Sequence, residues 1–183
     1  MNDLPNRKPN RLKDYDYSQN NAYFVTICTK DRHGLLGRIL VGGGFHAAPD
    51  IELSEIGKES VRTIEYINTN YHNVRIDEYV IMPNHIHMIV FLTGGHGNPV
   101  TGGHGNPMAG GHGNPPLQDV IGRFKSFTTK KWNELYKTKT QEMWQRSFHD
   151  HIIRDEADYQ NHLQYIDENP GKWAEDKYYN GDQ

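Results

Sequence analysis

Cysteine is almost absent from this 183-residue sequence, and the single Cys28 excludes an intrachain disulfide framework. Also absent is a charged start followed by a long apolar run, so we expect no signal peptide, no membrane span and a cytoplasmic location. The core must therefore form by packing alone. The length predicts one domain over residues 1–183 that accommodates an irregular insertion.

Neither sign of charge dominates the whole chain, whose formal net charge is -3. This balance argues against a uniformly basic nucleic-acid binder. The signs are nevertheless segregated along the sequence. Residues 1–38 and 117–147 carry +3 and +4, whereas residues 39–116 and 148–183 carry -4 and -6. A chain of this kind can present a basic groove to phosphates while remaining soluble.

Two segments lack the apolar periodicity of a core element. Residues 1–20 contain prolines and several basic side chains, and we expect an extended N-terminal arm there. Residues 93–116 hold three copies of an eight-residue unit, TGGHGNPV, TGGHGNPM and AGGHGNPP. Their glycine and proline content predicts a flexible surface insertion. Repeat expansion in a tolerant loop explains His96, His104 and His112 better than metal binding does.

The remaining sequence alternates between strand and helix patterns. Short runs rich in β-branched and aromatic residues predict strands, and apolar residues at helical spacing predict helices. We expect strands over 23–30, 35–41, 74–82 and 85–90, and a strand or strand-like edge over 143–153. We expect helices over 54–68, over 117–135 and from 155 to near Pro170. The strands 74–82 and 85–90 can pair as antiparallel neighbours across a short turn at Pro83 and Asn84.

Two histidines one residue apart interrupt the apolar run MPNHIHMIV at residues 82–90. Side chains two residues apart on a strand share a face and lie about 7 Å apart. His85 and His87 can therefore hold one metal ion between them. Ile86 and Met88 supply buried surface on the strand. The alternative is that each histidine is a satisfied core residue with no ligand.

The last predicted helix carries side chains that complement a metal held by these histidines. Tyr165 and Asn169 are four residues apart, so they project from one face on adjacent turns. A metal-assisted attack of the Tyr165 phenolate on a phosphodiester would leave a covalent phosphotyrosine. However, the chain has eleven tyrosines, and packing is the ordinary role of any one of them.

Cations are interleaved with aromatic residues along 117–135. Such a surface suits phosphates and unpaired bases, but it is also the pattern of an ordinary amphipathic helix with solvated lysines. The candidate cations are Arg123, Lys125, Lys130 and Lys131.

Three segments together resemble a known family. MPNHIHMIV looks like the His-hydrophobe-His motif of single-tyrosine HUH transposases. WQRSFHDHIIRDEADYQNHLQYIDENPGKW, residues 144–173, is similar to the carboxy-terminal signature of REP-associated tyrosine transposases, and YFVTICTKDRHGLLG, residues 23–37, to their first strand. The resemblance implies an α+β fold, with a ferredoxin-like antiparallel sheet, helices packed on it and an HUH endonuclease core. It also implies metal-dependent cleavage of single-stranded DNA next to palindromic hairpins, through a 5′-phosphotyrosine and a free 3′-hydroxyl.

The resemblance also assigns residues and partners. It implies that His85, His87 and Asn169 bind a divalent metal and that Tyr165 is the nucleophile. We expect Mg²⁺ or Mn²⁺, and two histidines with an amide oxygen also suit cobalt or zinc. Further DNA-contacting candidates are Trp144, Gln145, Arg146 and His149. Single-stranded or hairpin DNA is the expected partner, and the oligomeric state, monomer or homodimer, stays open. The GGHGNP repeat and the acidic tail depart from the family pattern.

Two other functions are compatible with the sequence. One is a domesticated protein that binds hairpin DNA without cutting it, with a steep dependence on salt. The other is a metal-dependent nuclease that activates water and forms no covalent adduct. The presence of His85, His87, Tyr165 and Asn169 together favours cutting over mere binding.

Overall fold

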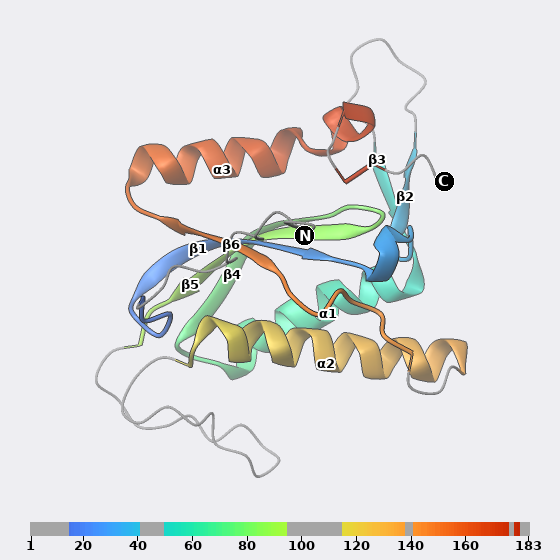
Figure 1. The fold of residues 1–183 in the computed structure, drawn as a ribbon, viewed down its shortest axis with the longest axis horizontal. Helices are drawn as coiled ribbons and strands as arrows, with labels where there is room; N and C mark the ends of the chain where they lie inside the picture. Colours follow the sequence, from blue (N-terminus) through green and yellow to red (C-terminus); the bar gives the residue numbers. More distant parts are fainter. Residues whose placement is uncertain (1–14, 41–49, 95–114, 138–140, 176–177, 180–183) are drawn as a thin grey trace, which may run out of the picture.

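A computed structural model describes residues 15–40, 50–94, 115–137, 141–175 and 178–179 (Figure 1). Most of the expected N-terminal arm and of the insertion at 93–116, with His96, His104 and His112, lies outside the described residues. In the part of the chain that is described, no helix combines the length and the apolar character that a membrane span needs.

An antiparallel sheet of four strands, in the order β4-β5-β1-β6, forms the centre of the fold. The strands are β1 (Asn21–Cys28), β4 (Val74–Ile81), β5 (His85–Leu92) and β6 (His149–Ile153). The expected antiparallel pairing of the two strands around Pro83 is confirmed, since β4 pairs with β5. β2 (Gly37–Leu40) and β3 (Asp50–Leu53) form a separate two-stranded ribbon.

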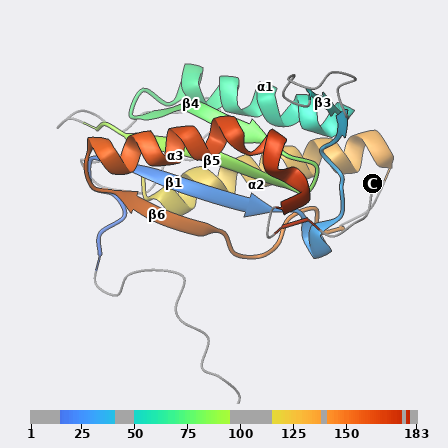
Figure 2. The same cartoon turned by 90° about the horizontal axis from the view of Figure 1, so that it is seen from above.

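Helices cover both faces of this sheet (Figures 1 and 2). α1 (Glu55–Asn70) and α2 (Leu117–Tyr136) pack on one face, and α3 (Glu156–Glu168) lies on the other. Ser54 and Asp155 cap the amino ends of α1 and α3, each accepting a hydrogen bond from a backbone N–H three residues on. Short 3-10 turns lie at Lys30–Arg32 and Pro170–Glu175. The expected α+β class, an antiparallel sheet with packed helices, is confirmed.

The strand expected over 143–153 is shorter than predicted, because β6 begins only at His149. Met143, Trp144 and Phe148 turn their side chains into the core instead of alternating across a sheet. Lys125 holds this segment beside α2, since its Nζ donates to the carbonyls of Gln145 and Ser147 at 2.9 Å each. An isolated bridge pairs Trp144 with Thr29, the residue after β1, and the Gln145 N–H donates to the Cys28 carbonyl at 2.9 Å.

The alternation of side chains along β5 divides the fold into two layers. Ile86, Met88 and Val90 belong to the large core cluster under α1 and α2. His85 and His87 point to the opposite face, toward α3. The histidines thus lie between the sheet and the helix that carries Tyr165.

Two helical glycines provide a matched test of the packing. A Cβ at Gly57 would lie 2.0 Å from the carbonyl oxygen of Leu36, which is itself fixed by the Ser54 N–H. We therefore expect Gly57→Ala to lower the free energy of unfolding by about 1–3 kcal/mol. A Cβ at Gly122 meets nothing within 4 Å, so Gly122→Ala should raise it by about 0.5–1 kcal/mol. Urea titrations measure both changes, and equal effects would contradict the close approach of α1 to Leu36.

Candidate active site

The rings of His85 and His87 converge beneath α3. Their centroids are 4.5 Å apart, and the two residues are 0% and 1% exposed. The sharing of a face follows from the two-residue period of the strand. Two imidazoles this close, shielded from bulk water, have the geometry of a pair of ligands to one ion.

Asn84 determines which nitrogen of His85 carries the proton. The Asn84 Nδ2 donates to the carbonyls of Arg32, at 3.1 Å, and Tyr178, at 2.8 Å, so its Oδ1 is the atom that faces His85 Nδ1 at 2.9 Å. An amide oxygen only accepts, and His85 Nδ1 must therefore donate. In the neutral ring this leaves the lone pair on Nε2, which is the form that binds a metal.

Thr26 orients the second histidine from the neighbouring strand. Its Oγ1 lies 2.8 Å from His87 Nδ1, and the register of β1 and β5 pairs the two residues directly. A hydroxyl can donate or accept, so this bond fixes the direction of the ring rather than its tautomer. Because Nδ1 bonds Thr26, Nε2 is the candidate metal-ligating nitrogen of this ring.

Tyr165 lies against this pair. Its ring meets the His87 ring edge-on, with centroids 5.0 Å apart, and is itself 38% exposed. Asn169, one turn further on at the carboxyl-terminal cap of α3, is 3% exposed. The predicted nucleophile is therefore in contact with a predicted metal ligand and is open to a substrate.

Phe24 holds the tyrosine and the histidine in place. Its ring stacks on His87 at 5.2 Å and meets Tyr165 at 5.9 Å and His162 at 4.5 Å. A rigid apolar ring between these groups limits their rotation. This role of a β1 residue was not evident from the sequence.

Two aromatic side chains near the C-terminus cover the histidines. The Tyr178 ring lies 4.6 Å from His85 and 5.9 Å from His87, and Trp173 lies 5.9 Å from His85. Each is 4% exposed.

A groove of about 450 Å³ opens on this side of the sheet. Its lining residues are Phe24, Thr26, Arg32, His149, Asp150, His151, His162 and Tyr178. The register places His87, Thr26 and His149 in one row across β5, β1 and β6, so His149 is roughly 10 Å from His87 on the same face. The Arg32 guanidinium, 5.1 Å from the Tyr178 ring, brings positive charge to the same groove.

The other predicted DNA-contacting residues lie on the α2 side of the sheet, away from Tyr165 (Figure 1). Arg146, Lys130 and Lys131 are exposed. A second groove, of about 800 Å³, is lined in part by Lys125, Lys130, Trp144, Gln145 and Arg146. Of the eight candidates, only His149 shares a groove with the residues around Tyr165.

Contacts on the α2 side give several of these candidates packing roles. Trp144 is 5% exposed, packs against Phe124 and donates its indole N–H to Thr128 at 2.8 Å. Its ring is thus in the core and is not displayed for stacking on bases. Lys125 bonds two backbone carbonyls, and the Arg123 guanidinium lies 5.8 Å from the Tyr71 ring.

Sequence reasoning missed six residues around the histidines: Phe24, Thr26, Arg32, Asn84, Trp173 and Tyr178. Asn84 carried a signal, because it directly precedes His85 and a polar residue beside a metal ligand often orients it. Phe24 and Thr26 alternate onto one face of the predicted first strand, but only the register of β1 against β5 identifies their partners.

The fold is of the transposase kind. The structure resembles that of a REP-associated tyrosine transposase bound to a REP hairpin, with a TM-score of 0.53 over 91% of this chain and 76% of the other, at 20% identity. An uncharacterised protein of Haemophilus influenzae is 32% identical over 182 residues, which cover 96% of this chain and 94% of the relative. The chain belongs to the same family as that protein. No protein-family model matches the sequence.

Proposed function

We propose that this protein is a metal-dependent DNA strand transferase, which cuts single-stranded DNA beside a REP-type hairpin and holds the cut strand as a 5′-phosphotyrosine. The observation that supports this proposal is the contact of the exposed Tyr165 with the buried His87. A hairpin is the ligand of the solved transposase with the same fold. It is therefore the first substrate to test.

The donor atoms of the site suit a divalent ion. Nε2 of His85, Nε2 of His87 and Oδ1 of Asn169 are buried atoms, and Asn84 and Thr26 bond the opposite nitrogens of the two rings. Imidazole nitrogens with an amide oxygen and added water are compatible with Mn²⁺ and Mg²⁺. We propose that these three residues hold the ion. When bound, it polarises a phosphate oxygen and stabilises charge in the transition state.

Tyr165 is the proposed nucleophile for the cleavage step. Its Oη attacks phosphorus while the bond from phosphorus to the 3′ oxygen breaks. The phenol proton passes to water, and the departing 3′ oxygen takes up a proton. One phosphoester bond replaces another, so the step is reversible and the strand can be transferred to a second 3′-hydroxyl. Phe24 and His87 hold the ring in position.

A hairpin oligonucleotide labelled at its 3′ end tests this function. With Mn²⁺, we expect the label to migrate with the protein under denaturing conditions, while a 5′ label appears on a shorter strand that ends in a 3′-hydroxyl. Labelled product without an adduct would instead indicate a nuclease that activates water. Retardation of intact DNA in native gels, without cutting, would indicate the hairpin-binding alternative.

Thr26→Val tests how His87 is oriented. The valine keeps the shape of the side chain but removes the bond to His87 Nδ1. We expect the Mn²⁺ concentration that half-saturates adduct formation to rise roughly 10- to 100-fold, as for other partners of metal-binding histidines. Thr63→Val is the matched control, since the Thr63 hydroxyl donates within α1 to the Glu59 carbonyl. An unchanged requirement for Mn²⁺ in Thr26→Val would contradict the role of Thr26.

A further inference from the structure

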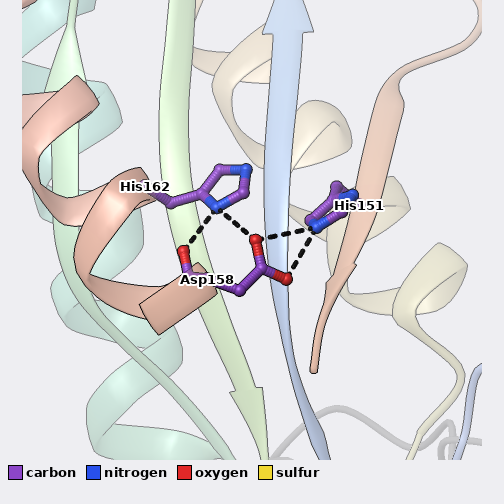
Figure 3. A group of neighbouring side chains, drawn as sticks. All are labelled: His151, Asp158 and His162. Carbon is purple, nitrogen blue, oxygen red and sulfur yellow. Dashed lines mark hydrogen bonds and ion pairs between the residues drawn. The ribbon is translucent and has the colours of Figure 1, made fainter. Parts of the chain in front are cut away.

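A second group of metal-ligating side chains meets near the start of α3 (Figure 3). His151 comes from β6, and Asp158 and His162 come from α3. One ligand atom from each lies within 4.8 Å of the others. His151 Nε2 is 2.9 Å from Asp158 Oδ2, and His162 Nδ1 is 3.2 Å from Asp158 Oδ1.

The backbone itself brings these three side chains together. Asp158 and His162 are four residues apart on α3, so they share a face. The register pairs His151 with Phe24, whose ring contacts His162, and this places His151 on the face that α3 covers. The two imidazole rings are stacked, with centroids 4.8 Å apart. The Asp158 carboxylate also accepts the Arg154 N–H, and its bond from His151 keeps its pKa below the ordinary value.

This cluster is separate from the His85–His87 pair but is coupled to it through α3. Asp158, His162, Tyr165 and Asn169 follow one another at spacings of four, three and four residues, which makes a single stripe along the helix. Phe24 lies between the two groups, because its ring contacts both His162 and His87. Any group that fastens Asp158 and His162 to β6 therefore also restrains Tyr165.

We propose that His151, Asp158 and His162 bind a second divalent transition-metal ion, of the Zn²⁺ or Co²⁺ type, which clamps α3 to β6. Two imidazoles and one carboxylate with solvent in the open position form a common ligand set for such ions. The side chains are 45%, 22% and 21% exposed, so an ion can enter from solvent and keep a water ligand. Both rings bind in their neutral form. His162 Nδ1 donates to the Asp158 main-chain carbonyl at 2.8 Å, so an ion bound at this nitrogen replaces that hydrogen bond, and the proton moves through solvent to the other ring nitrogen. The ion site does not depend on the proposed function, and only its effect on Tyr165 does.

Metal stoichiometry tests this site. The parent is the full chain carrying His96→Ala, His104→Ala and His112→Ala, so that the repeat histidines cannot contribute. Equilibrium dialysis against Co²⁺ should give two bound ions per chain, and one after His162→Ala or Asp158→Asn. His72→Ala, at an exposed position after α1, is the matched control and should retain two.

Other outcomes separate this inference from the proposed function. If the parent binds one ion and His162→Ala loses it, the result supports the site at His151, Asp158 and His162. It counts against an ion at His85 and His87. If the parent binds one ion, which His85→Ala loses and His162→Ala retains, the second site is overturned. Amide hydrogen exchange tests the clamp: Zn²⁺ should slow exchange along α3 in the parent and not in His162→Ala. Binding without slower exchange in α3 overturns the clamp.

Discussion

Tyr165→Phe should abolish the covalent protein–DNA adduct, with a loss on the order of 10³-fold or more, as expected when a nucleophile is removed. Phenylalanine retains the ring that packs against Phe24 and His87 and removes only the attacking oxygen. The fold and the hairpin affinity should therefore remain. The measurement is the yield of adduct from a 3′-labelled hairpin oligonucleotide in the presence of Mn²⁺.

Tyr159→Phe is the control for this variant. Tyr159 lies on the same helix, but its ring packs near Phe91, at 6.0 Å, on the apolar part of the α3 interface. Its substitution should leave the yield of adduct within a few fold of the parent. An adduct that persisted in Tyr165→Phe at the parent rate would show that another group is the nucleophile.

Most of the secondary structure was predictable because the hydrophobic periods are regular. β4, β5, α1 and α2 lie where alternating or helical patterns placed them, within a few residues at each end. The segment before β6 was not predictable. Trp144 and Phe148 resemble strand residues in composition, but the Lys125 bonds to backbone carbonyls and the packing of Trp144 on Phe124 hold that segment beside α2.

The candidate site was predictable in its parts but not in its geometry. The His-x-His spacing places His85 and His87 on one face, and the helical spacing joins Tyr165 to Asn169. Nothing in these spacings brings the two pairs together. That contact depends on the packing of α3 over β1 and β5, and the resemblance to a transposase family, rather than the spacing, joined the pairs at the sequence level.

The cluster at His151 illustrates the same limit. The sequence displays Asp158 and His162 at helical spacing, but His151 joins them only because β6 pairs with β1 in one register. A shift of one residue would turn His151 to the other face of the sheet. The same register brings His149 into the row of Thr26 and His87. Cross-strand register is a tertiary property that no local pattern in this chain encodes.

Separate His85→Ala and His87→Ala variants should reduce adduct formation at least roughly 10²-fold while leaving hairpin binding nearly unchanged. Each variant removes one ligand nitrogen of the proposed ion, whereas phosphate contacts elsewhere supply most of the affinity for DNA. Chelation of the parent protein should have the same effect as these substitutions, and excess Mn²⁺ should reverse it. His72→Ala is the control, because His72 is exposed in the turn after α1.

Comparing cleavage with binding across a salt series decides between the two classes of function. Binding to phosphates should weaken as salt rises in every variant. If a histidine only supports the fold, its alanine variant should lose DNA binding and cleavage together. If a histidine holds the ion, its alanine variant should lose cleavage alone, and the salt dependence of DNA binding should be unchanged. Because both rings are buried, each variant is first checked for a cooperative unfolding transition. Cleavage that resisted chelator and both substitutions would exclude a metal at His85 and His87, and with it the proposed role of the MPNHIHMIV strand.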